Sequence, residues 1–207
     1  MNPVNRQIGL FGGSFDPVHC GHLILARDFR ETCELDEVVF IPAARAPLRK
    51  DGPRADGETR LKMLRAAIAD TAGFSATDLE IRRGGTSYTI ETVTALAEIE
   101  PGATFYWLIG ADQLSQLDQW KAVDRLCEQL IFAVAARPGT DPEPPASMDG
   151  LQTVRLPDRQ LDLSSTEIRR ALADGRSIDF LVHPAVHRII QTENLYQRKA
   201  STPAYGS

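Results

Sequence analysis

Residues 12–22 read GGSFDPVHCGH, and they join a short apolar run at 7–11 to a helical pattern from about 18 to 33. A short apolar run followed by glycines is typical of a buried strand. In open α/β sheets, ligands bind at the end of the sheet where strands pass into helices. The sequence therefore predicts a strand, a ligand-binding loop and a helix, in that order.

Outward from this stretch, apolar runs alternate with helical patterns along the chain. The expected further strands are 37–41, 76–81, 104–109, 130–135 and 151–156, and the expected further helices are 58–70, 88–99, 165–173 and 184–192. Several of these strands are continuous apolar runs, which is typical of a parallel sheet that helices cover on both faces. The expected fold class is α/β, a doubly wound parallel sheet with a small C-terminal helical region.

A single domain is expected over residues 1–199, because 207 residues suit one domain of ordinary size. The α/β core is expected at about 6–156 and the helical part at about 164–196. The last residues, 200–207, are expected to form a disordered tail.

The composition indicates a soluble protein of the cytoplasm. Hydrophobic residues make up 43% and charged residues 25% of the chain, close to the globular average. No apolar run reaches the roughly 20 residues that a membrane span needs, and the N-terminus lacks the pattern of a signal peptide. The three cysteines are widely spaced, which favours free thiols in a reducing compartment.

Charge excludes a general attraction to nucleic acid, because the net charge is −5. Between residues 45 and 65, however, seven basic residues stand against three acidic ones. Such a local excess suits a small anionic ligand, although a solvated loop is an equal alternative at this point.

The loop at 12–22 carries the features of a phosphate site. Gly12 and Gly13 let the backbone approach a ligand closely, and the helix start offers N–H groups at its positive end. His19 and His22, three residues apart, share one face of the helix, and Gly21 between them leaves room for a bulky group.

Other interpretations of this loop are weaker. It is neither a P-loop nor the G-x-G-x-x-G dinucleotide fingerprint, which disfavours a dehydrogenase. The histidines could be surface or helix-capping residues, and a zinc site lacks an obvious third ligand. Cys20 is a poor candidate nucleophile, since it points away from the histidine face.

A second phosphate site is expected where residues 163–170 read LSSTEIRR. Ser164 and Glu167 have the spacing of a capping box, so a helix begins there. Ser165 and Thr166 then place hydroxyl and N–H groups at the positive end of that helix, with Arg169 less than one turn further. A plain capped helix is the alternative.

These two stretches resemble the signatures of one superfamily. GGSFDPVHCGH resembles the H-x-G-H signature of the nucleotidyltransferases with a Rossmann-like fold, and LSSTEIR resembles their I-S-S-T-x-I-R motif, with Leu163 in the Ile position. The segments TSYTIET at 86–92 and IGAD at 109–112, followed by Trp120, resemble the bacterial nicotinate mononucleotide adenylyltransferases. The resemblance runs from about residue 8 to 196.

The resemblance implies transfer of AMP from ATP to nicotinate mononucleotide by direct in-line attack. It implies that the catalytic residues are His19, His22 and Arg169. The ATP-binding residues would be Gly12, Gly13, Ser14, Phe15, Gly21, Gly110, Asp112, Ser165 and Thr166. The acceptor-binding residues would be Arg49, Thr86, Tyr88 and Trp120. Mg²⁺ would accompany ATP, and no protein metal site is expected.

One departure and several alternatives accompany this hypothesis. Where the family usually has Pro-Pro-His-Lys/Arg, this chain has Leu48 followed by Arg49, so the histidine is missing. The acceptor could instead be nicotinamide mononucleotide or another phosphate monoester, such as phosphopantetheine. A regulatory module without turnover would be expected to have lost His19, His22 or Arg169. The expected partners are the two substrates, with neither nucleic acid nor a membrane, and an oligomer is compatible with the sequence.

Overall fold

The computed structural model describes residues 5–47, 52–135, 143–145, 148, 150–159 and 162–197. The expected tail at 200–207 lies outside the described residues, as do Leu48 and Arg49.

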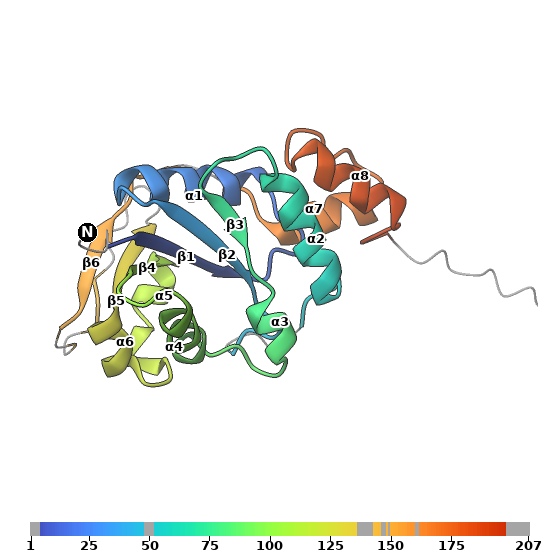
Figure 1. The fold of residues 1–207 in the computed structure, drawn as a ribbon. Coiled ribbons are helices and arrows are strands. Elements are labelled where there is room, and N and C mark those ends of the chain that lie inside the picture. Colours follow the sequence, from blue (N-terminus) through green and yellow to red (C-terminus); the bar gives the residue numbers. More distant parts are fainter. Residues whose placement is uncertain are drawn as a thin grey trace, which may run out of the picture.

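Six parallel strands form one sheet in the described part of the chain, in the order β3-β2-β1-β4-β5-β6 (Figure 1). The strands are β1 Gln7–Gly13, β2 Glu37–Pro42, β3 Phe74–Ala76, β4 Thr104–Gly110, β5 Leu130–Ala135 and β6 Gln152–Arg155. The chain winds outward from β1 to β3, and then returns to the other side of β1 with β4. The fold-class prediction, a Rossmann-like doubly wound sheet, is confirmed, and its switch point lies between β1 and β4.

Helices cover both faces of this sheet (Figure 1). One face packs against α1 Cys20–Thr32, α2 Gly57–Ile68 and α7 Ser165–Ala173, and the other against α4 Thr89–Ile99, α5 Ala111–Leu114 and α6 Val123–Gln129. The last helix, α8 Pro184–Thr192, packs on α2. Two short elements, α3 Leu79–Arg83 and a 3₁₀ turn at Leu117–Gln119, complete the described helices.

Apolar side chains hold each helical layer to the sheet. Phe29 of α1, Met63 of α2 and Ile168 of α7 are all fully buried in one cluster. Val93 of α4 and Leu126 of α6 are fully buried in the second cluster on the opposite face. Full burial of one such side chain stabilises the fold by about 1.5–3 kcal/mol. The clusters therefore fix the strand ends and helix starts that face the ligand site.

The predicted strand at 76–81 is wrong in the structure. A short edge strand ends at Ala76, and Leu79 begins α3 instead. An ion pair between Asp78 and Arg82, one helical turn apart at 2.9 Å, supports the helix, and Glu80 is buried against α4. The predicted helices at 165–173 and 184–192 agree with α7 and α8. No helix is predicted from the sequence where α5 and α6 lie.

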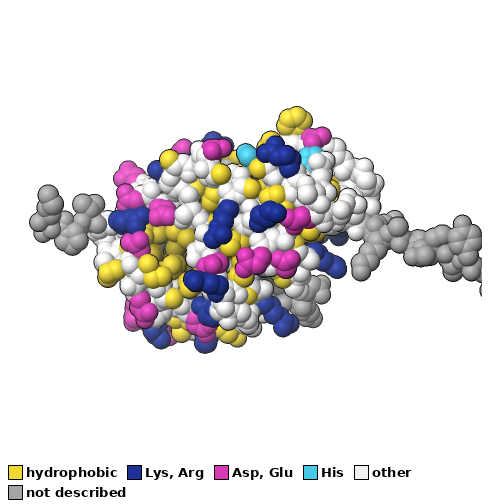
Figure 2. Space-filling view, turned by 45° about the vertical axis from the view of Figure 1, so that its right-hand side comes forward, with side chains coloured by type: hydrophobic (Ala, Val, Ile, Leu, Met, Phe, Trp, Pro, Cys, Tyr) yellow, Lys and Arg dark blue, Asp and Glu magenta, His cyan; other side chains and the backbone are white. Residues whose placement is uncertain are grey.

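The surface carries charge of both signs. On the face shown in Figure 2, Lys and Arg side chains lie among Asp and Glu side chains, with hydrophobic side chains between them. Within the described ranges, no helix is long and apolar enough to cross a bilayer.

Candidate active site

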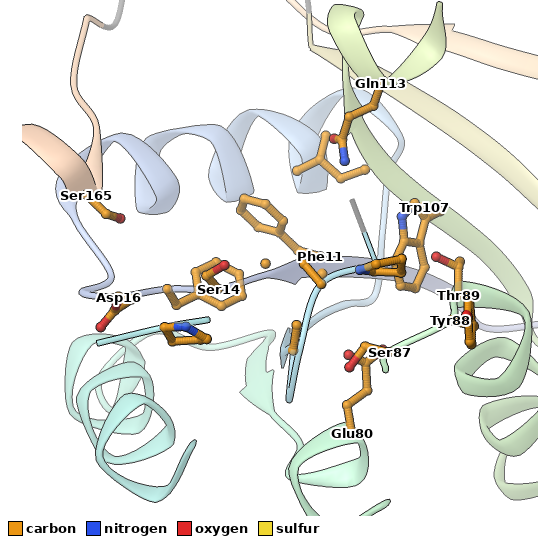
Figure 3. A pocket seen from close by; sticks show the side chains of 18 of the residues that line it. Phe11, Ser14, Asp16, Glu80, Ser87, Tyr88, Thr89, Trp107, Gln113 and Ser165 are labelled. Atoms are coloured by element: carbon orange, nitrogen blue, oxygen red, sulfur yellow. The ribbon is translucent and has the colours of Figure 1, made fainter. Parts of the chain in front are cut away.

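A cavity of about 810 Å³ lies at the carboxyl ends of β1 and β4, which is the switch point of the sheet. Its walls come from the loop after β1, from the starts of α4 and α7, and from the segment after β4. Figure 3 shows Asp16 and Ser165 at one end of this cavity, and Tyr88 and Trp107 at the other. The cavity thus extends from the two expected phosphate sites toward the expected acceptor site.

The structure brings most of the sequence-predicted site residues to this cavity. Its lining includes Gly12, Gly13, Ser14, Phe15, His22, Tyr88, Asp112, Trp120, Ser165, Thr166 and Arg169. The lining does not include His19, Gly21, Thr86 or Gly110. His22 and Arg169, which come from opposite ends of the chain, therefore line the same space.

The two histidines at the start of α1 have different environments. Their ring centroids are 3.6 Å apart, and His19 lies behind His22, with only 6% of its surface exposed. The backbone N–H of His19 donates to Nδ1 of His22 at 3.2 Å. Because Nδ1 of His22 accepts this bond, the proton of the neutral ring is on Nε2. His22 lines the cavity, and in this tautomer Nε2 is the nitrogen of its ring that donates.

His19 is held neutral by its surroundings. Burial lowers its pKa to about 4, although the charge of Glu167 acts weakly in the opposite direction. Its Nδ1 is buried and has no hydrogen-bond partner among the described residues. His19 is therefore better placed to support the ring of His22 than to contact a ligand in the cavity.

Gly21 serves this histidine pair rather than the cavity wall. A Cβ atom at Gly21 would lie 3.0 Å from Nδ1 and 3.1 Å from Cε1 of His19. The bulky group for which the sequence leaves room is thus the ring of His19. Gly12 has a similar role, because a Cβ atom there would lie 2.8 Å from the ring of Trp107.

The start of α1 offers fewer N–H donors to a ligand than the sequence suggests. The N–H of Cys20, its first helical residue, donates to the carbonyl of Leu181 at 2.9 Å. That donor is therefore engaged within the protein. Burial also raises the pKa of the Cys20 thiol, which lowers its reactivity and disfavours Cys20 as a nucleophile.

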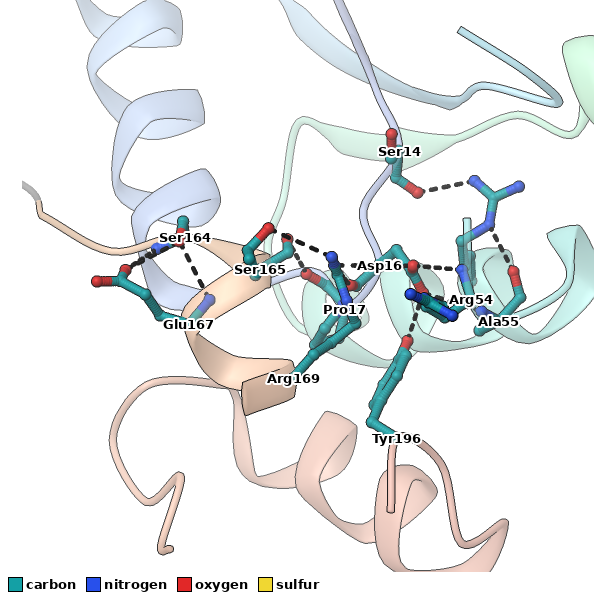
Figure 4. Close-up of polar contacts among 12 residues, drawn as sticks. Ser14, Asp16, Pro17, Arg54, Ala55, Ser164, Ser165, Glu167, Arg169 and Tyr196 are labelled. Carbon is teal, nitrogen blue, oxygen red and sulfur yellow. Dashed lines mark hydrogen bonds and ion pairs between the residues drawn. The ribbon is translucent and has the colours of Figure 1, made fainter. Parts of the chain in front are cut away.

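The start of α7 joins the first loop directly. Ser164 accepts from the N–H of Glu167 at 3.2 Å, which completes the expected capping box (Figure 4). The Ser165 hydroxyl donates to the Pro17 carbonyl at 2.9 Å. One guanidinium nitrogen of Arg169 donates to Thr166 Oγ1 at 3.2 Å. The bond from Ser165 to Pro17 joins the start of α7 to the loop before α1, whereas the other two bonds lie within α7 and its cap.

The opposite end of the cavity is aromatic. Tyr88 is the N-cap residue of α4, and the ammonium of Lys121 lies 4.3 Å from the centre of its ring. Trp120 packs edge-on against Phe132, with ring centroids 6.4 Å apart. Lys121 also pairs with Glu91 at 2.6 Å, so it links α4 to the segment that carries Trp120. A flat aromatic ligand could stack in this end of the cavity.

Sequence reasoning missed several lining residues. Ser87 lies where Thr86 was expected, and its hydroxyl accepts from the N–H of Ala44 at 3.0 Å. Trp107 lies within an apolar strand, where the sequence predicts a core residue. The only signal of its place in the wall is Gly12, against which its ring packs. Gly110 likewise makes room for Asp112, whose Oδ1 lies 2.5 Å from where a Cβ atom would be.

One residue of the basic segment is structural. Arg60 of α2 is 2% exposed and donates to the carbonyls of Ser14 at 2.7 Å and Ala55 at 3.2 Å. Burial lowers the pKa of its guanidinium, although the nearby carboxylate of Asp16 opposes this effect. Arg60 therefore holds the loop after β1 in place through the Ser14 carbonyl, whereas Arg54 lines the cavity.

No cluster of three or more His, Cys, Asp or Glu side chains that could hold a metal ion is found in the described part of the chain.

Comparisons with known proteins give the family of the chain. The model of the cytidylyltransferase-like family matches residues 10–171. The fold, the two helix starts and this match define the chain as a nucleotidyltransferase. It is 40% identical over 191 residues to the probable nicotinate-nucleotide adenylyltransferase of Opitutus terrae, covering 92% of this chain and 98% of that protein. The chain belongs to the family of nicotinate-nucleotide adenylyltransferases.

Further relatives support this family. The probable nicotinate-nucleotide adenylyltransferase of Rhodopirellula baltica is 38% identical over 204 residues, covering 93% of this chain and 94% of that protein. Nicotinic acid mononucleotide adenylyltransferase of Plasmodium falciparum, solved in complex with NaAD, shares the fold with a TM-score of 0.75. It is 21% identical, and the match covers 92% of this chain and 97% of that one.

Proposed function

We propose that the protein transfers the adenylyl group of ATP to nicotinate mononucleotide, giving nicotinate adenine dinucleotide and pyrophosphate in NAD biosynthesis. One observation carries this proposal: His22 and Arg169 line a single cavity whose far end carries Tyr88 and Trp120. One end thus suits a triphosphate and the other a flat pyridine ring. The relatives named nicotinate-nucleotide adenylyltransferase support this choice of acceptor.

The proposed chemistry is a direct in-line displacement. An oxygen of the acceptor phosphate forms a bond to the α-phosphorus of ATP, and the bond from that phosphorus to the pyrophosphate oxygen breaks. The second pKa of a phosphate monoester is about 6, so at neutral pH the acceptor is already a nucleophile and needs no general base. Catalysis then depends on alignment and on stabilising negative charge.

Each side chain at the phosphate end has a proposed role. His22 donates from Nε2 to an oxygen of the α-phosphate, while the neutral ring of His19 holds it in place. Ser165, Thr166 and Arg169 bind the β- and γ-phosphates at the start of α7, where the helix dipole favours negative charge. Asp16 orders the first loop, because its carboxylate accepts hydrogen bonds from the N–H groups of Arg54 and Ala55.

At the acceptor end, Trp120 and Tyr88 are proposed to pack on the pyridine ring. The backbone at the start of α4 would supply N–H donors to the nicotinate carboxylate. ATP enters with a divalent cation, which we take to be Mg²⁺. The three cysteines are free thiols. This supports the cytoplasm as the compartment of the reaction.

The test is pyrophosphate release from ATP and Mg²⁺ with three separate acceptors. We expect the highest kcat/KM with nicotinate mononucleotide, a lower value with nicotinamide mononucleotide, and none above background with phosphopantetheine. Preference for phosphopantetheine would replace the proposed acceptor. ATP binding without pyrophosphate release from any acceptor would favour a regulatory module.

A further inference from the structure

The C-terminal segment contacts Asp16, a residue of the cavity wall, through one side chain. Tyr196 lies after the end of α8, and its hydroxyl donates to Oδ1 of Asp16 at 2.7 Å (Figure 4). Burial, together with the negative charge of Asp16, raises the pKa of Tyr196, so the hydroxyl remains a donor. This contact joins residues that are 180 positions apart in the sequence.

Asp16 connects four parts of the chain at this point. Its side chain is nearly fully buried and accepts from the backbone N–H of Arg54 at 2.6 Å and of Ala55 at 3.1 Å. Its own carbonyl accepts from Arg169 at 2.7 Å, and the Arg169 guanidinium lies 3.8 Å from Oδ2. The first loop, the segment before α2, α7 and the C-terminal segment therefore meet at one residue.

Tyr196 is held in place independently of Asp16. Lys62 of α2 pairs with Glu193 at the end of α8 at 2.5 Å, and the N–H of Leu195 donates to the carbonyl of Ile190 at 3.0 Å. Tyr196 itself has a φ of 64°, a left-handed conformation that bulky residues rarely adopt. Such conformations persist where the surroundings fix them, and they are frequent at functional sites.

Loss of the Tyr196 hydroxyl would loosen Asp16 without breaking the fold. A buried carboxylate is stable only when donors surround it. Oδ1 would keep only one of these two donors, the N–H of Ala55. Because Arg54 and Arg169 line the cavity beside Asp16, movement of Asp16 would displace both groups.

We propose that Tyr196 is a positioning residue for the triphosphate end of the cavity, acting through Asp16 on Arg169 and on the segment at 54–55. The inference rests on the proposed binding of ATP at this end. It makes the C-terminal segment a support of the active site, and it assigns Tyr196 no contact with either substrate.

The first test is binding of ATP with Mg²⁺, and separately of nicotinate mononucleotide, to the full chain by calorimetry. We expect Tyr196→Phe to weaken ATP binding about tenfold and to change mononucleotide binding less than about twofold. Tyr106→Phe is the matched control, because Tyr106 lies on β4 outside the cavity, and we expect neither affinity to change. A merely structural role would leave both affinities of the folded Tyr196→Phe protein unchanged, and that result would overturn the inference.

The second test is amide hydrogen exchange, which needs no substrate. We expect faster exchange at the N–H groups of Arg54 and Ala55 in Tyr196→Phe, and unchanged exchange in α4, which serves as the internal reference for an intact fold. Unchanged exchange at both amides would contradict the inference. If the unaltered protein failed to bind ATP, the proposed function would fail instead, so the two failures are distinguishable.

Discussion

At the scale of single residues, His22 is the side chain on which the proposed chemistry depends most. Its Nδ1 accepts from the backbone of His19, so Nε2 carries the proton. Loss of one preorganised donor at a developing negative charge commonly costs a factor of about 10²–10³ in rate. We therefore expect His22→Ala to lower kcat by that factor in the pyrophosphate-release assay.

The control for this variant is His187→Ala, since His187 lies on α8 outside the cavity and pairs with Asp179. We expect it to keep normal turnover. Circular dichroism should show that both variants remain folded. Near-normal turnover of the folded His22→Ala protein would exclude His22 from the chemistry.

His19 should make stability depend on pH. Its pKa is near 6.5 in the unfolded chain and about 4 in the folded protein. Between these values the unfolded state binds more protons, so the contribution of His19 is fully present above pH 6.5 and is lost as pH falls toward 4. The whole loss is on the order of 3 kcal/mol at most.

His19→Asn removes this titration and keeps a residue that is favoured at a helix start. Urea unfolding from pH 4 to pH 8 should therefore show a steeper fall in the free energy of unfolding for the unaltered protein than for the variant. Parallel curves for the two proteins would mean that His19 is not buried as a neutral ring.

Some residues of the candidate site could be predicted from the sequence and others could not, for a physical reason. A motif gives spacing along the chain, and this was enough to bring His22, Ser165 and Arg169 to one cavity. It could not distinguish a residue in the wall from one behind it, as with His19 and Gly21, because that depends on how the rings pack. Tyr196 belongs to no motif, and only the fold brings it to Asp16.

At the scale of elements, the first turn of α1 needs a glycine at position 21, because the ring of His19 packs against it. In Gly21→Ala, the new methyl group would have to displace the buried ring of His19 by a few tenths of an ångström. Misplacement of a catalytic group by such distances lowers rate more than stability, and alanine itself favours a helix. We expect kcat to fall about tenfold, with a change in melting temperature of less than about 3 °C.

The measurement is turnover and thermal unfolding of the same sample of Gly21→Ala. Unchanged turnover would show that the His19 ring has room to move. A large loss of stability would instead mean that the main role of Gly21 is in packing.

The sequence predicted long elements well and short ones poorly. The helix at 165–173 has a capping box and a clear apolar face, so local signals are sufficient to define it. Around 76–81 the apolar residues alternate as in a strand, yet buried contacts of Glu80 with α4 favour a helix at 79–83. Contacts distant in sequence therefore decided the structure there.

At the scale of the whole molecule, the cavity unites groups from both ends of the chain, so a ligand that fills it must stabilise the entire fold. ATP at 100 times its Kd should stabilise the folded state by about 2.7 kcal/mol. For a chain of this length the melting temperature should rise by roughly 5–10 °C. Arg169→Ala should greatly reduce the rise, whereas Arg176→Ala, which alters an exposed arginine beyond α7, should keep it. Scanning calorimetry with and without ATP and Mg²⁺ measures both shifts. A full rise in Arg169→Ala would mean that the triphosphate does not bind between the two helix starts.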